Sequence, residues 1–229
     1  MVQQLSLFSS ISKSQYELTK TSIETLTGFK SLTYQNINLI SSPKIITKYE
    51  PNSKNAQYEQ YKINLKAPFK PELHRNDYKD WILSIMDIPS AGKRKINTQS
   101  ILESNIQILD KESNIDKYLD DLGYKVDTEY VIKGERFFYV NNITIEIFQI
   151  LVKTETTQET EVKEKGDWEP IDPNFYIIKA FINVEKATDI ENLQKSSNHL
   201  LNLKNELTGL VELDISDRNS MDSRIGLRK

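Results

Sequence analysis

The sequence has no cysteine, which excludes disulfide bonds, thiol catalysis, iron–sulfur clusters and zinc sites built on thiolates. Histidine is nearly absent as well, and the wide separation of His74 and His199 in the chain argues against a histidine-rich metal site. The absence of cysteine also fits an intracellular location. We therefore predict a protein that uses no metal and no cofactor.

Glycine is scarce, with seven residues scattered over a chain of 229. Neither a G-x-x-x-x-G-K-[ST] loop nor a G-x-G-x-x-G turn is present, so the sequence lacks the backbone-amide cradles of the common nucleotide-binding folds. No apolar run reaches the roughly 20 residues that cross a bilayer, and no charged segment followed by an apolar core indicates a secretory signal. We predict neither a membrane span nor a signal peptide.

Neither sign of charge is in excess, because 30 Lys and Arg stand against 33 Asp and Glu, for a net charge of −3. Nothing therefore indicates sequence-specific binding to nucleic acid. Hydrophobic residues make up 38% of the chain, which is low for a globular protein but more than a disordered chain needs. The length suits one domain, which we place at residues 1–215, followed by a tail at 216–229.

Most of the chain has the patterns of β-strands. Residues 2–11 alternate apolar and polar side chains and predict a strand. Residues 31–69 are rich in Ile, Leu, Tyr and Thr and are interrupted by prolines, so short strands separated by turns are expected there. Residues 81–89 are apolar at both parities, which is typical of a strand covered on two faces. The run 98–109 fits either a strand or a helix.

The clearest pattern is a hairpin between residues 124 and 153. Apolar residues alternate on both sides of Asn141 and Asn142, and two asparagines tolerate the positive φ that a two-residue hairpin turn demands. We expect Gly134 to interrupt the first of the two strands. Further strands are predicted at 174–185 and 210–215.

Three helices are predicted where apolar residues recur at helical spacing between capping signals. The predicted helices and their first and last signals are 14–27 with Ser14 and Gly28, 113–122 with Ser113 and Gly123, and 188–208 with Thr188 and Gly209. Strands that follow one another through short turns favour an antiparallel sheet over parallel units. The pattern therefore indicates a mainly β protein with a few helices (α+β), built on a rolled or closed antiparallel sheet.

Residues 153–167 are mostly Thr, Glu and Lys, so burial cannot offset the entropy of ordering them, and we predict a mobile polar loop over about 153–170. Within it, Glu159, Glu161 and Lys163 form E-x-E-x-K. On a strand this spacing would point two carboxylates and a lysine to one face, as tunnel-type triphosphatases use to hold a metal and a phosphate. In so polar a run, we interpret the match as a consequence of composition.

No catalytic centre stands out from the remaining residues. His74 lies near Asp77 and Asp80, and we interpret it as an ordinary loop histidine because no serine elbow or thiol accompanies it. Glu146 and Glu212 lie on predicted strands. We interpret them as charges on solvated faces, with carboxylates in the lumen of a barrel as the alternative.

Two clusters are candidates for binding a partner. Lys93 and Arg94 lie in a basic turn that could contact phosphate or an acidic protein. Arg218, Met221 and Arg224 lie in the tail, and arginine and methionine are enriched at protein interfaces. We predict that these five residues bind a partner and that the tail is a docking segment.

Four segments resemble, in the same order, one known family: the fungal eighteenth subunit of the Mediator complex. The segments are VQQLSLFSSI at the start, WILSIMDIPSAGKR in the middle, the hairpin GYKVDTEYVIKGERFFYVNNITIEIFQI, and the region from FINVEKATDI to LVELDISDRNSMDSR. The family pattern D-I-P-x-A-G is met by Asp87, Ile88, Pro89, Ala91 and Gly92. A second specific motif, D-R-x-S-M-D-S-R, follows the last predicted strand.

The resemblance implies a non-enzymatic subunit of the Mediator head module, folded as a many-stranded antiparallel β-barrel similar to that of tunnel triphosphatases. It implies a heterodimer with the twentieth subunit, tethered to the other head-module subunits by the carboxy-terminal helix of the eighth subunit. This pair would form a movable jaw near RNA polymerase II in the nucleus, where it bridges regulators and polymerase to regulate transcription. The first strand, VQQLSLF, lacks the E-x-E-x-K charges that a tunnel enzyme needs there, which favours a scaffold.

Two alternative functions stay open. Carboxylates clustered at inward-facing strand positions would favour a metal-dependent triphosphatase. A large cavity lined by Ile, Phe and Tyr would favour a barrel that holds a small apolar ligand. The direction in which the side chains between 137 and 150 point distinguishes these alternatives.

Overall fold

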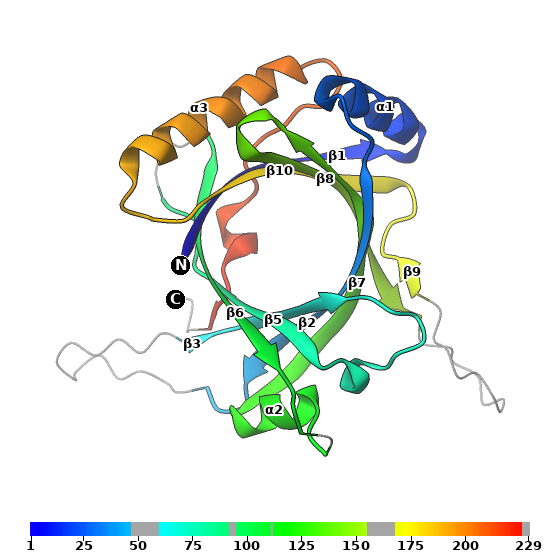
Figure 1. Cartoon of the computed structure of the whole chain (residues 1–229), viewed down its shortest axis with the longest axis vertical. Helices are drawn as coiled ribbons and strands as arrows, with labels where there is room; N and C mark the ends of the chain where they lie inside the picture. Colours follow the sequence, from blue (N-terminus) through cyan, green and yellow to red (C-terminus); the bar gives the residue numbers. More distant parts are fainter. Residues whose placement is uncertain (47–59, 92–94, 111, 155–167, 226–229) are drawn as a thin grey trace.

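The structure is a computed structural model that describes residues 1–46, 60–91, 95–110, 112–154 and 168–225. Eight antiparallel strands close into a ring, because β10 pairs with β1 on one side and with β8 on the other (Figure 1). In ring order the strands are β10 (Phe175–Val184), β1 (Val2–Ser12), β6 (Asn97–Gln107), β5 (Asp80–Met86), β4 (Ile63–Pro68), β2 (Leu32–Pro43), β7 (Tyr124–Tyr139) and β8 (Ile143–Lys153). The predicted fold class, a mainly β antiparallel barrel, is confirmed.

The described part of the chain forms three α-helices, which lie outside the ring (Figure 1). They are α1 (Tyr16–Thr27), α2 (Ile115–Asp121) and α3 (Ile190–Glu206). The smaller elements are β9 (Trp168–Pro170), β3 (Gln60–Tyr61), β11 (Arg224–Ile225), and the 3-10 turns η1 (Lys13–Gln15), η2 (Arg75–Asp77), η3 (Val140–Asn142) and η4 (Arg218–Met221). None of the helices in the described part of the chain has the length and hydrophobicity that crossing a membrane requires.

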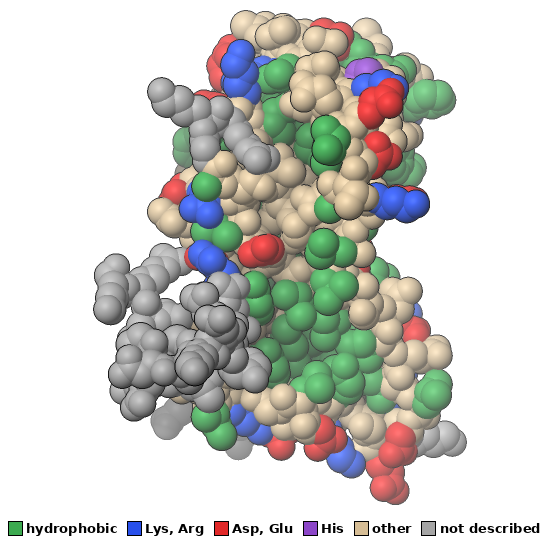
Figure 2. Space-filling model, turned by 90° about the vertical axis from the view of Figure 1, so that its left-hand side faces the viewer, with side chains coloured by type: hydrophobic (Ala, Val, Ile, Leu, Met, Phe, Trp, Pro, Cys, Tyr) green, Lys and Arg blue, Asp and Glu red, His purple; other side chains and the backbone are tan. Residues whose placement is uncertain are grey.

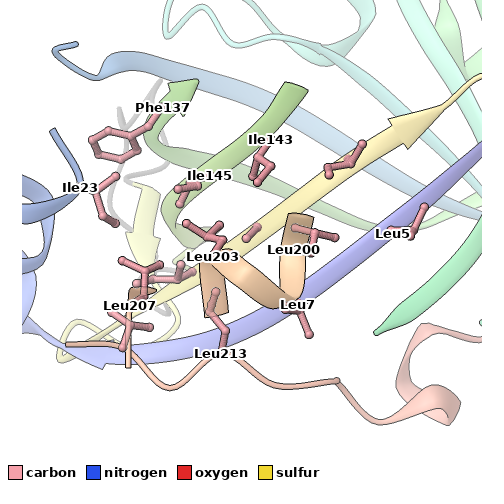
Figure 3. Packing of buried hydrophobic residues seen from close by; sticks show 14 of the residues in the cluster. Leu5, Leu7, Ile23, Phe137, Ile143, Ile145, Leu200, Leu203, Leu207 and Leu213 are labelled. Carbon is pink, nitrogen blue, oxygen red and sulfur yellow. The ribbon is translucent and has the colours of Figure 1, made fainter. Parts of the chain in front are cut away.

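The main hydrophobic core lies outside the ring, between the barrel wall and the helices α1 and α3. The outward side chains of β1, β8 and β10 are apolar and pack against Leu200 and Leu203 of α3, both at most 1% exposed (Figure 3). Ile23 of α1 joins the same cluster against Phe137 of β7 (Figure 3). Each such buried side chain contributes about 1.5–3 kcal/mol through the hydrophobic effect, so the helices hold the wall in place from outside.

A second core lies beneath α2 at the opposite side of the ring. Leu119 and Ile115 of α2 are fully buried and belong to one cluster with Trp81 of β5 and Val131 of β7. The indole of Trp81 also packs against the ring of Tyr78, with centroids 5.5 Å apart. Both cores therefore use the outward parity of the strands, and the opposite parity is left for the interior of the barrel.

The hairpin turn was predicted correctly. Asn141 and Asn142 both have φ of 60°, and β8 returns from β7 in register with it. The prediction that Gly134 interrupts the first strand of the hairpin is wrong. The strand runs through it because the neighbouring backbone of β8 comes so close at Ile147 and Phe148 that a side chain has no room.

The glycines that end the helices were predicted correctly, since Gly28, Gly123 and Gly209 all have positive φ. The residues that begin the helices were predicted wrongly. The side chain of Asn114, not Ser113, accepts a hydrogen bond from Lys117 N at 2.9 Å to begin α2. In α3 the residue is Asp189, and before α1 the capping box uses Ser12 and Gln15 in η1.

The run 98–109, which fitted two patterns, forms strand β6. The strand predicted at 210–215 is absent, because the segment makes a single bridge between Phe8 and Asp214 and otherwise has no ladder. Residues 155–167 of the predicted loop, which include Glu159, Glu161 and Lys163, lie outside the described residues. The two ends of the predicted loop are strand rather than loop. Lys153 belongs to β8, and residues 168–170 form β9.

Candidate functional site

The interior of the barrel is lined by both polar and apolar side chains. Because the apolar parity packs outward under the helices, the inward positions carry the other side chains of each strand. Gln4 of β1 faces Asn183 of β10, and its side-chain amide donates to the Asn183 oxygen at 2.9 Å. Asn38 of β2 is buried and donates to the carbonyl of Asn36 at 3.0 Å. Phe148 of β8 and Phe181 of β10 share the inward parity with these polar side chains, so the lumen is mixed and does not form the uniformly apolar cavity that a barrel for a small apolar ligand would need.

Side chains between 137 and 150 follow the same rule. Ile143, Ile145 and Ile147 are buried in the outer core, whereas Glu146 points inward. The interpretation of Glu146 as a charge on a solvated outer face is therefore wrong, and the lumen alternative is correct. Glu212 lies after α3 and not on a strand, where its carboxylate accepts from Gly209 N at 3.0 Å.

Inward charges form a row across three neighbouring strands. In the ladder, Lys179 of β10 is opposite Glu146 of β8, which is opposite Arg136 of β7. The guanidinium of Arg136 holds Glu146 Oε1 through Nη2 at 2.6 Å and through Nε at 2.8 Å. The same guanidinium lies 4.7 Å over the ring of Tyr34. Burial and the negative charge of Glu146 raise the pKa of Tyr34 above its usual range, so its hydroxyl stays protonated and can donate to that carboxylate.

Lys179 has a different environment. Its ammonium group lies 4.8 Å from the ring centroid of Phe181 and 5.8 Å from that of Phe8. Burial lowers the pKa of Lys179, Glu146 opposes that shift, and the positive charge of Lys66 on β4 adds to it. The carboxylates of Glu146 and Glu103 both favour the charged form of Lys179, although burial outweighs them and leaves its pKa lowered.

A hollow of about 390 Å³ lies over three neighbouring strands of the wall, β4, β5 and β6. It is lined by Lys66, Pro68, Asp80, Trp81, Ile82, Asn105, Ile106 and Gln107. The far end of β6 is covered by the tail instead, because the side chain of Asn97 donates to Ser216 Oγ at 2.7 Å and that of Gln99 to the carbonyl of Met221 at 3.2 Å.

The predicted partner-binding residues of the tail all contact the chain itself. Arg218 Nε donates to the carbonyl of Pro89 at 2.5 Å, and Met221 Sδ accepts from Ser216 Oγ at 2.8 Å. Arg224 is held by Asp222, with Nε 2.9 Å from Oδ1, and pairs with β3 through the β11 ladder. Lys93 and Arg94 lie outside the described residues. Binding of a partner by these five residues stays a prediction.

A triphosphatase would need carboxylates grouped at inward positions of neighbouring strands. Glu103 on β6 and Glu146 on β8 point inward from separate walls, and Glu146 is already held by Arg136. In the part of the chain that the structure describes, no three carboxylate or histidine side chains are grouped so that they could hold a metal ion. His74 begins the η2 turn, where its backbone N donates to Asp77 Oδ2 at 2.9 Å. The clustered carboxylates that a triphosphatase would need are not formed by these residues.

A patch of the outer wall is apolar and incompletely covered. The outward residues Leu83, Ile85, Leu102 and Ile106 lie on neighbouring strands β5 and β6, and Ile85 is directly opposite Leu102 in the ladder. Leu102 is 48% exposed, and the other three are half-buried. Figure 2 shows hydrophobic side chains gathered on the lower half of the left-hand side of the molecule. We name these four residues the β5–β6 face.

Comparison with known proteins gives the family. A family model described as Med18 protein matches residues 3–224. The chain belongs to the Med18 family. It is 30% identical to a protein of Kluyveromyces lactis named Mediator of RNA polymerase II transcription subunit 18, over 98% of each chain. It is 32% identical to the protein of that name from Eremothecium gossypii, over 99% of this chain and 98% of the relative. The resemblance seen in the sequence is confirmed.

A solved structure shares the fold of this Med18 family member. A chain in the structure of the Schizosaccharomyces pombe Mediator head module superposes with a TM-score of 0.71, covering 97% of this chain and 100% of that chain. Sequence identity between the two is 16%, so this likeness concerns the fold.

Two motifs that carried the resemblance meet at the end of the Med18-family barrel that the tail covers. Pro89 of D-I-P-x-A-G accepts the hydrogen bond from Arg218 of D-R-x-S-M-D-S-R. The side-chain amide of Gln99 joins the same two segments, because it donates to the carbonyl of Asp87 at 2.7 Å as well as to that of Met221. Both motifs therefore help to hold the tail over this end of the barrel.

The inward charges Lys66, Arg136 and Lys179 were missed in the sequence. A signal was present: Lys179 is the one charged residue in the run FYIIKAFINV, at the parity opposite to Ile178 and Ala180. A charge at one parity of a strand whose other parity is buried points into whatever lies on the second face. In a closed barrel that second face is the lumen.

Proposed function

We propose that this chain is a non-enzymatic subunit of the Mediator head module and serves as a scaffold in the regulation of transcription by RNA polymerase II. The observation that carries the proposal is the agreement of nearly the whole chain with proteins named as subunit 18, together with the shared fold of a head-module chain. Activity then depends on contact surfaces, and the location is the nucleus.

The partners we propose are the twentieth subunit, as a heterodimer, and the carboxy-terminal helix of the eighth subunit, within a movable jaw that bridges regulators and RNA polymerase II. The β5–β6 face supports a role in assembly, because an apolar patch on an otherwise polar wall is what the buried centre of a subunit interface requires. A few anchors at the centre of such a patch provide most of the binding energy.

The direct test is co-expression of the full chain with the eighth and twentieth Mediator subunits of the same organism, followed by size-exclusion chromatography. We expect a stoichiometric ternary complex. A chain that elutes as a monomer and ignores both subunits contradicts the proposal.

A pair of variants tests the surface. Leu102→Glu places a charge at the exposed centre of the β5–β6 face, and we expect it to weaken complex formation at least tenfold while the isolated chain stays folded, because the side chain is 48% exposed. Leu18→Glu on α1, where the leucine is 64% exposed, is the matched control and should assemble normally. Equal assembly of both variants excludes the β5–β6 face as the interface.

A further inference from the structure

Strand β6 has an open edge over residues 102–107. Its ladder with β1 ends at the pair of Val2 with Ile101, whereas its ladder with β5 continues to the pair of Asp80 with Gln107. Residues 102–107 therefore have a neighbouring strand on one side only. Among the described residues, none makes a backbone hydrogen bond with the other side of this stretch.

The direction of the unpaired backbone groups follows from the bonds that β6 makes toward β5. The carbonyl of Ser100 accepts a hydrogen bond at 2.9 Å from the segment that follows β5, and Ile108 N donates at 2.8 Å to the segment that precedes β5. Even-numbered residues of β6 thus bond toward β5, and in a regular antiparallel strand the odd-numbered residues bond toward the other side. Glu103, Asn105 and Gln107 consequently each point an N–H and a C=O at the open side, and all three residues are exposed.

This edge lacks the features that keep strand edges unpaired. Proteins protect such edges with proline, lysine, a β-bulge, or a covering helix or loop. Residues 102–107 contain no proline and no lysine, and their register with β5 is regular. Five of these six residues are exposed, so the described part of the chain does not cover them. The edge is therefore open to pairing with another polypeptide.

The two sides of the edge differ in chemistry. On the outer side, Leu102 and Ile106 belong to the β5–β6 face. On the inner side are the exposed carboxylates of Glu103 and of Asp80, which lines the hollow of about 390 Å³. Lys66 also lines that hollow, but it is on β4, two strands away from β6. A strand beside β6 would therefore place alternate side chains against apolar groups and against carboxylates.

We propose that the open edge of β6 binds an extended segment of a partner protein by strand addition, with apolar side chains on the outer side and lysine or arginine on the inner side. This mode of binding rests on the proposed function, in which the β5–β6 face is an assembly surface. The open stretch of 102–107 spans about 20 Å, which is the usual length of a strand.

A strand satisfies this site better than a helix does. A helix on the β5–β6 face would bury the apolar side chains but would leave the backbone groups of Glu103, Asn105 and Gln107 without partners. An added strand buries the same apolar side chains and pairs those backbone groups as well. We expect the added strand to be antiparallel to β6, as are the ladders that β6 forms with β1 and β5.

The test measures binding of a fluorescent synthetic peptide to the purified full chain by anisotropy. The peptide alternates isoleucine with lysine and threonine, and a scrambled peptide of the same composition, in which the alternation is lost, is the control. We expect saturable binding of the alternating peptide and none of the scrambled one, because only alternation sorts the side chains between the two sides of the edge.

Two variants at one position separate the backbone from the side chain. Asn105→Pro removes an N–H that points at the open side and leaves the bonds toward β5 in place, so it should weaken peptide binding about tenfold or more while the chain stays folded by circular dichroism. Asn105→Ala is the matched control, because it removes the same side chain but keeps the N–H. It should bind the peptide within about twofold of the wild type.

Hydrogen exchange gives an independent readout on the wild-type chain. The amides of Glu103, Asn105 and Gln107 should exchange fast in the free chain and slow down when the alternating peptide is added, whereas the amides of α1 keep their rates. This measurement decides the matter even if a variant fails to fold.

Several results would overturn the proposal. They are absence of saturable binding at millimolar peptide, equal binding of the scrambled peptide, equal loss in Asn105→Ala, or exchange at the edge that the peptide does not change. A wild-type chain that dimerises in analytical ultracentrifugation, with the dimer lost in Asn105→Pro, would show that a second copy occupies the edge. None of these measurements uses another Mediator subunit, so their failure is separate from a failure of the co-expression test.

Discussion

Replacing Gly134 by alanine separates local propensity from packing, because the two predict opposite signs. Alanine loses less conformational freedom on folding than glycine, so propensity alone predicts a gain of about 0.5–1 kcal/mol in the free energy of unfolding. In the structure, however, a Cβ atom at Gly134 would overlap the carbonyl oxygen of Ile147. It would also lie 2.5 Å from Phe148 Cβ and 2.7 Å from Phe148 Cα.

The magnitude follows from these contacts. Carbon atoms pack comfortably at about 3.5–4.0 Å, so β7 and β8 would have to separate by about 1 Å. The atoms in the way belong to the backbone and to Cβ of β8, which no change of rotamer can move aside. Overpacking of this kind costs about 1–3 kcal/mol, and we take the upper end because a ladder is displaced. Against the gain of about 1 kcal/mol from propensity, the net destabilisation is about 2 kcal/mol.

The assay is urea unfolding followed by circular dichroism, with a thermal scan beside it. A loss of about 2 kcal/mol corresponds to a decrease of about 4–8 °C in Tm for a domain of this size. Lys133→Ala, on the exposed face of the same strand, is the control and should stay within about 0.5 kcal/mol of the wild type. A Gly134→Ala variant as stable as the wild type, or more stable, refutes the argument that close backbone approach selects glycine here.

Three further predictions concern the outer cores and the tail. Burial raises the pKa of Glu135, but hydrogen bonds from Lys20, Ser31 and Tyr16 outweigh it and leave the pKa lowered, so this carboxylate stabilises the fold above its ordinary pKa. Glu135→Gln should therefore cost about 1 kcal/mol at pH 7, and the difference from wild type in urea should vanish as the pH falls through and below about 4. Leu119→Ala beneath α2 should cost about 2–5 kcal/mol in the same assay, whereas a cost under about 1 kcal/mol would contradict the second core. Deleting residues 217–229 should leave the barrel folded by circular dichroism but weaken binding to the sister subunits, and unchanged affinity would count against a docking tail.

Periodicity was sufficient to predict most of the fold. Alternation at 2–11 and around Asn141 and Asn142 predicted β1 and the hairpin correctly. The reason is that one face of each strand packs against the outer helices, whereas the other face lines the lumen. Positive φ at Gly28 and Gly123 was equally readable, since glycine is the residue that takes this conformation without strain.

The features that failed depend on neighbours distant in sequence. Gly134 resembles a strand breaker locally, and only the approach of β8 makes it a packing requirement. The 210–215 segment has the composition of a strand, but it meets only the end of the β1 edge beyond Ser6, where the pairing with β6 stops and Phe8 bridges Asp214. Glu146 looks like a solvated charge until the sheet closes, and closure requires β10 to pair with β1 on one side and with β8 on the other.

Ring closure also sets the order in which the chain can fold. The seam joins β1 to β10, and the side-chain bond between Gln4 and Asn183 spans 179 positions of sequence. During synthesis the first strand must therefore wait, with one edge unpaired, until most of the chain has left the ribosome. Pairings of such long range make folding slow and leave strand edges exposed to aggregation in the meantime. Of the three described α-helices, α3 alone follows the last barrel strand in sequence, so this helix is synthesised after the whole wall that it covers.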